Sequence, residues 1–215
     1  METLQDKPDK IFTIGVDVQN DFCPGGKLAV NNGDQVITPL NRLFNYTRNN
    51  NGFIIATGDQ HPAKSPHFDL WPIHCIAGTY GAEIRDDLDV RANDIIINKG
   101  MGQTNGYSGF EGLTDKGQTI ESIVYPKDRE RIAILIGGLA TDYCVLNTVM
   151  DALNLAERVR KSQTGKIAVY AIEDAMRAVN LKIDDGRNAL EAMQKAGAII
   201  INSADIIENN ILRIN

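Results

Sequence analysis

Short apolar runs recur along the chain and are separated by stretches in which apolar residues return at roughly helical spacing. A run that is apolar at nearly every position predicts a strand covered on both faces, as in a parallel sheet. The predicted strands cover residues 11–16, 53–57, 94–98, 132–136, 166–172 and 198–201. Predicted helices cover residues 34–50, 118–124, about 141–160 and 183–195, and a short helix is expected after residue 203.

Strands that alternate with helices indicate a parallel sheet with helices on both faces, so we expect a three-layer α/β/α fold around six mainly parallel strands. The chain has 215 residues, 43% of them hydrophobic, which is enough for a large core. We find no internal repeat and no interdomain linker, and we therefore expect one domain over residues 1–215.

Net charge and cysteine content indicate which partners and which cellular compartment are expected for the protein. The net charge is −6 and neither sign is concentrated in a block, which argues against nucleic acid or an anionic membrane as a partner. The charged N-terminal stretch is unlike a secretory signal, and no apolar run is long enough to span a membrane. The odd set Cys23, Cys75 and Cys144 suits a reducing compartment, so a cytoplasmic protein is expected. The sequence gives no oligomeric state, and a homo-oligomer stays open.

Four chemically reactive side chains follow four successive predicted strands: Asp17, Asp59, Lys99 and Cys144. Taken singly, such residues are more often turn residues, solvated strand ends or packing groups. In an open parallel sheet, however, ligands bind beyond the carboxyl ends of the strands. Their joint occurrence predicts that all four converge on one cleft.

Cys144 lies in the first turn of a helix predicted to begin near Thr141, where Thr141 and Asp142 can accept hydrogen bonds from free backbone N–H groups. The same position favours a thiolate over a thiol. A neighbouring aspartate could accept the thiol proton and a lysine could hold that aspartate ionised. Backbone N–H groups around Ala140 and Cys144 could stabilise an oxyanion.

All three histidines lie in one proline-rich loop at residues 60–81, where Asp59, His61, His67 and His74 follow one another. Aspartate with histidine is an ordinary ligand set for Zn²⁺, Fe²⁺ or Mn²⁺. The alternative is that these residues are loop caps and surface groups, and one histidine could also pair with the cysteine.

Four apolar residues, Phe22, Leu28, Trp71 and Tyr107, occur in the same loops as the charged groups. They could line a pocket for a flat ring or simply pack the loops, and the sequence favours neither. The glycines do not form a dinucleotide or P-loop motif, which argues against a Rossmann dehydrogenase.

These residues also carry a family likeness, which runs in order from about residue 12 to at least residue 175. The chain resembles the nicotinamidases, a branch of the isochorismatase-like cysteine hydrolases. The motifs that carry the likeness are DVQNDF (17–22), GDQHP (58–62), WPIHC (71–75), KG (99–100), YSGFEG (107–112) and GLATDYCV (138–145).

The resemblance implies a doubly wound sheet with Asp17, Lys99 and Cys144 as a catalytic triad. It further implies an oxyanion hole at Ala140 and Cys144, with a cis peptide bond between Leu139 and Ala140. The segment after about residue 178 is expected to contribute to the fold only.

The resemblance also implies one divalent metal ion, with zinc ahead of iron or manganese. Its ligands would be Asp59, His61 and His74, with His67 as a further ligand. Phe22 and Trp71 would sandwich a pyridine ring whose nitrogen reaches the metal.

The activity implied is hydrolysis of nicotinamide to nicotinate and ammonia in NAD salvage, through a cysteine thioester, with pyrazinamide as a second substrate. Two alternatives remain at this stage. One is another amidohydrolase of the superfamily that acts on a carbamoyl or ureido group. The other is a catalytically silent metal-binding protein.

Overall fold

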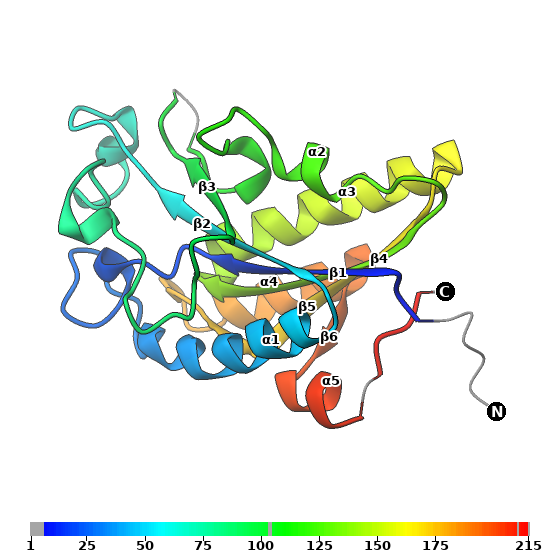
Figure 1. Cartoon of the computed structure of the whole chain (residues 1–215). Coiled ribbons are helices and arrows are strands. Elements are labelled where there is room, and N and C mark those ends of the chain that lie inside the picture. The colour runs from blue at the N-terminus through cyan, green and yellow to red at the C-terminus, as the bar shows by residue number, and fades with distance from the viewer. Residues whose placement is uncertain (1–6, 103–104, 210, 215) are drawn as a thin grey trace.

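The computed structural model describes residues 7–102, 105–209 and 211–214. Its centre is a six-stranded sheet in the order β3-β2-β1-β4-β5-β6, and every pairing of neighbouring strands is parallel (Figure 1). The strands are β1 Lys10–Val16, β2 Phe53–Asp59, β3 Ile95–Lys99, β4 Arg131–Leu139, β5 Lys166–Arg177 and β6 Ile199–Ile201. All six predicted strands are confirmed, although β4 and β5 run further than predicted.

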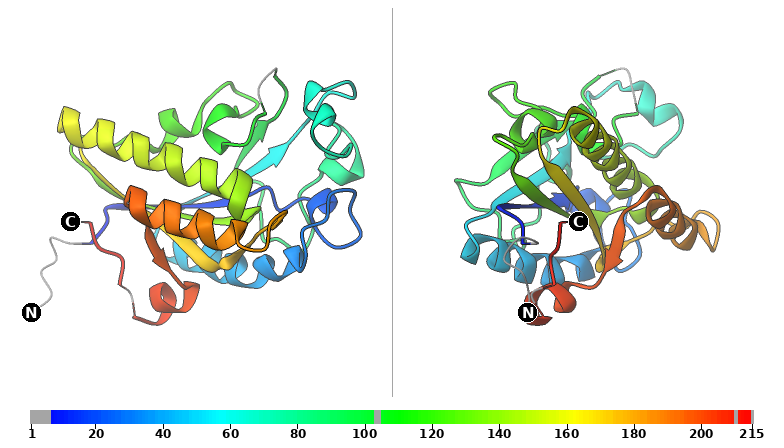
Figure 2. Two further views of the ribbon diagram at one scale, coloured as in Figure 1. Left: turned by 180° about the vertical axis from the view of Figure 1, so that it is seen from behind. Right: turned by 90° about the vertical axis from the view of Figure 1, so that its right-hand side faces the viewer.

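Helices cover both faces of the sheet, as the alternation of elements predicted (Figures 1 and 2). The helices are α1 Ile37–Asn49, α2 Ile120–Val124, α3 Leu146–Ser162, α4 Asp185–Ala196 and α5 Ser203–Asn209. Buried residues of α1 and α5 belong to one core cluster, and those of α2, α3 and α4 belong to the other. Within β1, Phe12 and Ile14 belong to the core cluster that contains the buried residues of α3. The hydroxyl of Thr13, between them, forms a hydrogen bond with that of Thr47 in α1, on the other face of the sheet. This alternation is that of a strand buried on both faces.

The chain winds outward from β1 to β3 in one direction and from β4 to β6 in the other. The fold is therefore doubly wound, and the direction reverses between β1 and β4. Long connections follow β2 and β3, and they lie beyond the carboxyl ends of the strands (Figure 1). No helix in the described part of the chain is both long and apolar enough to cross a membrane.

The start of the helix after β4 differs from the prediction. Residues Thr141–Val145 form a π-helical turn, and α3 begins only at Leu146. The residue in the N-cap position is Ala140, and no side chain caps the turn. The carboxylate of Asp142 instead accepts hydrogen bonds from the N–H groups of Val179 and Asn180, both at 2.9 Å. The prediction of Asp142 as a helix cap is therefore wrong, because a distant loop supplies better-placed donors.

Candidate active site

Four strand-end residues converge where the winding direction reverses. Asp17 follows β1, Asp59 and Lys99 end β2 and β3, and Cys144 lies in the π-helical turn after β4. All four are buried. Asp17 has a φ of +49°, a left-handed conformation that turns the chain sharply as it leaves β1. The predicted convergence on one site is observed.

Lys99 is the centre of this group, with a side chain that is fully buried. Its Nζ lies 2.8 Å from Asp17 Oδ2 and 2.6 Å from Asp59 Oδ1. It also donates to the carbonyl oxygen of Gly106 at 2.8 Å and lies 3.5 Å from the Sγ of Cys144. One ammonium group therefore contacts two carboxylates and the thiol.

The electrostatic consequences differ among the four residues. Burial alone would lower the pKa of Lys99, but Asp17 and Asp59 raise it well above the ordinary value, so the ammonium is charged. For Asp59, burial raises the pKa, but Lys99 and His61 together outweigh it, so the pKa of its carboxyl is lowered. For Asp17, burial outweighs Lys99 and the pKa is raised. Asp17 is thus the carboxyl better suited to take up a proton and return it.

Cys144 rests as a thiol rather than as a thiolate. Burial raises its pKa well above the ordinary value, and Lys99 lowers it by less. The sequence-based expectation of a thiolate, drawn from the start of a helix, is wrong for the resting protein because the sulfur is enclosed. A base is therefore needed to activate it, and Asp17 is the neighbouring carboxyl with a raised pKa.

The peptide bond between Leu139 and Ala140 is cis, as the family likeness implied. It joins the end of β4 to the turn that carries Cys144, and Ala140 and Cys144 both border the same cavity. The carbonyl oxygen of Ala140 accepts hydrogen bonds from Tyr143 and Val145, which fixes the first turn against the strand.

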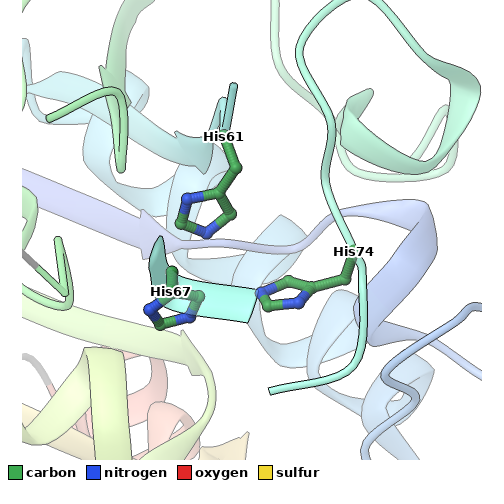
Figure 3. Close-up of side chains that lie close together, drawn as sticks. All are labelled: His61, His67 and His74. Carbon is green, nitrogen blue, oxygen red and sulfur yellow. The ribbon is translucent and has the colours of Figure 1, made fainter. Parts of the chain in front are cut away.

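The three histidines form a compact cluster in which one ring nitrogen of each lies within 4.8 Å of the others (Figure 3). The Nδ1 atoms of His61 and His74 lie 2.8 Å and 2.6 Å from the carbonyl oxygens of Gly100 and Pro72. A carbonyl oxygen only accepts, so both Nδ1 atoms donate, and Nε2 is the nitrogen of each ring that can face a metal ion. Two buried ring nitrogens, His61 Nε2 and His67 Nδ1, have no hydrogen-bond partner among the described residues.

The cluster therefore fits a divalent cation. Burial lowers the pKa of His67 to about 4 and also lowers that of His74, so both rings are neutral and able to bind a metal at neutral pH. Orphaned lone pairs in a buried site cost free energy unless a ligand satisfies them. Asp59 borders the cluster, since its Oδ2 lies 3.6 Å from His61 Nε2 while its Oδ1 contacts Lys99.

Gln19 fixes the backbone that carries Asp59. Its side-chain oxygen accepts a hydrogen bond from the N–H of Asp59 at 2.8 Å. Its side-chain amide donates to the carbonyl oxygens of Asp59 and Ala82 at 2.9 Å and 2.7 Å. Gln19 is fully buried, so the end of β2 is held on both sides of the peptide unit.

A cavity of about 390 Å³, including its open mouth, is bordered by Cys144 and by two of the histidines, His67 and His74. The four predicted pocket residues all border it, and the indole N–H of Trp71 donates to the hydroxyl of Tyr107 at 3.0 Å. The lining residues are Phe22, Leu28, Val30, Asp59, His67, Trp71, His74, Tyr107, Ala140, Tyr143, Cys144 and Val179. The open question of pocket lining versus loop packing is thereby answered in favour of a pocket.

Three lining residues escaped the sequence reasoning: Val30, Tyr143 and Val179. Tyr143 adjoins Cys144 and meets Trp71 edge to face, with ring centroids 4.9 Å apart, so its position next to the cysteine was an available signal. Val179 lies in a segment expected to contribute to the fold only, yet it borders the cavity. No local pattern marks Val179, because the hydrogen bonds that its loop donates to Asp142 link residues far apart in sequence.

Comparison with known proteins agrees with this geometry. A family model described as "Isochorismatase domain" matches residues 13–205. The nicotinamidase of Escherichia coli (strain K12) is 32% identical over 212 residues, which cover 88% of this chain and 93% of that protein. The pyrazinamidase of Pyrococcus horikoshii, solved in complex with zinc, has a TM-score of 0.73 and 32% identity, and the match covers 91% of this chain and 99% of that one. PnC1 from L. infantum, solved in complex with nicotinate, has a TM-score of 0.71 at 26% identity, over 91% of this chain and 93% of that one.

Proposed function

The chain belongs to the isochorismatase family, and we propose that it is a metal-dependent nicotinamidase that hydrolyses nicotinamide to nicotinate and ammonia. The observation that carries this proposal is the cavity itself. Its lining combines Cys144, which lies beside Lys99, with four aromatic side chains and with His67 and His74 of the histidine cluster. A flat heteroaromatic amide is the kind of molecule that uses all three features.

The first half of the proposed reaction forms a thioester. Asp17 accepts the proton of the Cys144 thiol, and the sulfur attacks the carboxamide carbon. The Lys99 ammonium, which contacts both Asp17 and Cys144, offsets the negative charge that develops. The backbone N–H groups of Ala140 and Cys144 stabilise the oxyanion, an effect worth about 3 kcal/mol per donor in other hydrolases.

The second half releases the products. Asp17 returns its proton to the departing nitrogen, which leaves as ammonia. A water molecule then adds to the thioester, with Asp17 again as the base, and nicotinate leaves as the carbon–sulfur bond breaks. The raised pKa of Asp17 suits a group that must accept and donate in turn.

We further propose that Asp59, His61 and His74 hold a divalent ion, with His67 as an additional ligand. Zinc is the first candidate, with iron and manganese as alternatives, since histidine with carboxylate suits all three. When bound, the ion supplies a Lewis acid that binds the ring nitrogen and orients the ring. The P. horikoshii relative was solved with zinc, which supports this choice.

The aromatic side chains are proposed to bind the substrate ring. Phe22 and Trp71 would sandwich it, while Leu28 and Tyr107 complete the wall. Pyrazinamide has the same ring shape and the same carboxamide, so we expect it to be a second substrate. A reducing compartment such as the cytoplasm suits the protein, because Cys23, Cys75 and Cys144 are all free and buried.

The decisive experiment is ammonia release by the purified protein from nicotinamide, pyrazinamide and an N-carbamoyl amino acid. We expect release from the first two and its loss in Cys144→Ala. Release only from the carbamoyl compound would indicate the alternative amidohydrolase, which needs no aromatic slot. No release from any of them, with zinc bound, would indicate a catalytically silent metal-binding protein.

A further inference from the structure

Asp21 is a buried carboxylate beside the histidine cluster that the proposed reaction does not use. It lies in a short 3-10 turn, Asn20–Phe22, and is only 4% exposed. Its Oδ2 accepts a hydrogen bond from the backbone N–H of Cys75 at 2.7 Å, and its Oδ1 accepts one from the N–H of Lys27 at 3.2 Å. No lysine or arginine among the described residues forms an ion pair with it.

Cys75 links Asp21 to two of the histidines. It follows His74 directly and has a φ of +42°, a left-handed conformation that few residues other than glycine adopt. Its carbonyl oxygen accepts a hydrogen bond from the N–H of His61 at 2.9 Å, and the carbonyl oxygen of His61 accepts one from the N–H of Ala77. The bond from Cys75 to Asp21 therefore anchors the backbone that sets His74 against His61.

The carboxylate is also enclosed from a third side. Gly81 lies against it so closely that a Cβ there would fall 2.1 Å from Oδ2. Gly81 belongs to the 3-10 turn Tyr80–Ala82, and Ala82 accepts the hydrogen bond from Gln19 described above. The turn and the carboxylate are therefore packed in direct contact.

We propose that Asp21 is a positioning residue for the metal ligands, and that its negative charge favours a divalent cation at the histidines. The inference rests on the metal site of the proposed function. The geometric half follows from two hydrogen bonds in series, from the N–H of Cys75 to the Asp21 carboxylate and from the N–H of His61 to the carbonyl oxygen of Cys75, which fix the ligand-bearing segments. The charge half follows from burial, since an enclosed carboxylate without a cationic partner gains from positive charge nearby.

A neutral amide could keep the hydrogen bond from Cys75 but would lose the charge. Asp21→Asn therefore tests the charge half with little change in shape. Gly81→Ala tests the geometric half, because its methyl group displaces the carboxylate while leaving the charge in place. Changes to groups that orient metal ligands typically weaken metal affinity about 10- to 100-fold.

The experiment measures the dissociation constant for zinc of the full chain by competition with a chelating dye, together with thermal unfolding of the metal-free protein. Asp174→Asn is the matched control. Asp174 also accepts a backbone N–H hydrogen bond, at 2.7 Å, but its donor is Ser203 of α5 rather than a residue of the histidine loop. We expect both test variants to bind zinc at least about tenfold more weakly than the wild type and the control.

Each other outcome has a defined meaning. Zinc affinity equal to that of the control, with or without a lower melting temperature, would overturn the inference and leave Asp21 a structural residue. Unchanged zinc affinity with a raised KM for nicotinamide would overturn it as well, in favour of a role in placing Leu28, whose N–H bonds to the carbonyl oxygen of Asp21. A wild-type protein that binds no zinc would refute both this inference and the proposed metal site, whereas weak binding confined to the variants supports both.

Discussion

Replacing Lys99 by methionine tests the electrostatic design of the site most directly. Methionine retains most of the apolar stem but removes the ammonium that lies 2.8 Å from Asp17 and 2.6 Å from Asp59. The buried group then holds two carboxylates with no countercharge. Removing one partner of a buried ion pair typically costs roughly 3–5 kcal/mol of unfolding free energy. Because the ammonium of Lys99 pairs with both carboxylates and is fully buried, we expect a loss at the upper end of that range at neutral pH.

The double variant Lys99→Met with Asp17→Asn separates charge from packing. It restores the net charge of the buried group to −1, the value for two carboxylates and one ammonium. We therefore expect it to recover about half of the lost stability while remaining inactive, with ammonia release at least about 10²-fold below wild type because the base is also gone. The assay is urea unfolding of the chelator-treated proteins, followed by far-UV circular dichroism.

The pH dependence of the unfolding free energy tests the direction of the charge effect. In the wild type the pKa of Asp59 lies below the ordinary value of 3.8. Ionised Asp59 therefore stabilises the folded protein above that pH, and this stabilisation is lost as the pH falls. Without Lys99, burial remains and raises the pKa of both carboxyls. The single variant should then be closest to wild type in acid and fall further behind as the pH rises. A Lys99→Met protein that matches wild type at pH 7 would refute the reasoning.

Three further measurements test other parts of the site. Burial raises the pKa of the Cys144 thiol. The rate at which iodoacetamide alkylates Cys144 in the metal-free protein, measured by mass spectrometry, should therefore increase steadily above neutral pH. A rate that no longer increases above pH 7 would indicate a resting thiolate. His74→Ala should raise KM for nicotinamide in zinc-supplemented steady-state assays, because a ligand that orients the ring is lost, and an unchanged KM would contradict that role. Val179→Trp should fill part of the cavity and raise KM for nicotinamide at least about tenfold. The control Ile183→Trp, which replaces a side chain that is 90% exposed, should leave KM unchanged. Equal effects of the two substitutions would argue against Val179 as a wall of the pocket.

The strands and the convergence of four side chains were predictable because both follow from local patterns combined with one general rule. Apolar runs indicate buried strands, and parallel strands place their carboxyl ends at one edge, so Asp17 and Lys99 had to lie near each other. The clustering of the histidines was also predictable, because all three occur within one short segment of the sequence.

What escaped prediction depends on contacts between segments that are remote in sequence. Aspartate is a residue type that often caps helices, yet the carboxylate of Asp142 accepts a hydrogen bond from the N–H of Val179 in a distant loop. Burial of Cys144 could not be read from its place in a turn, and burial, not the helix start, decides its protonation. Asp21 likewise has no neighbour in sequence that reveals its bond to Cys75, 54 residues away.

The proposed mechanism assigns different tasks to two chemically identical carboxyl groups that share one lysine. Burial opposes ionisation of both and is the largest single effect at each, but at Asp59 the interactions with Lys99 and His61 together outweigh it. At Asp17 burial prevails, although Thr57 donates a hydrogen bond to Oδ1 at 2.6 Å. A carboxyl with a lowered pKa is suited to permanent ligation, and one with a raised pKa is suited to moving a proton. The division of labour between Asp17 and Asp59 therefore arises from their surroundings, with Lys99 as the charge that both require.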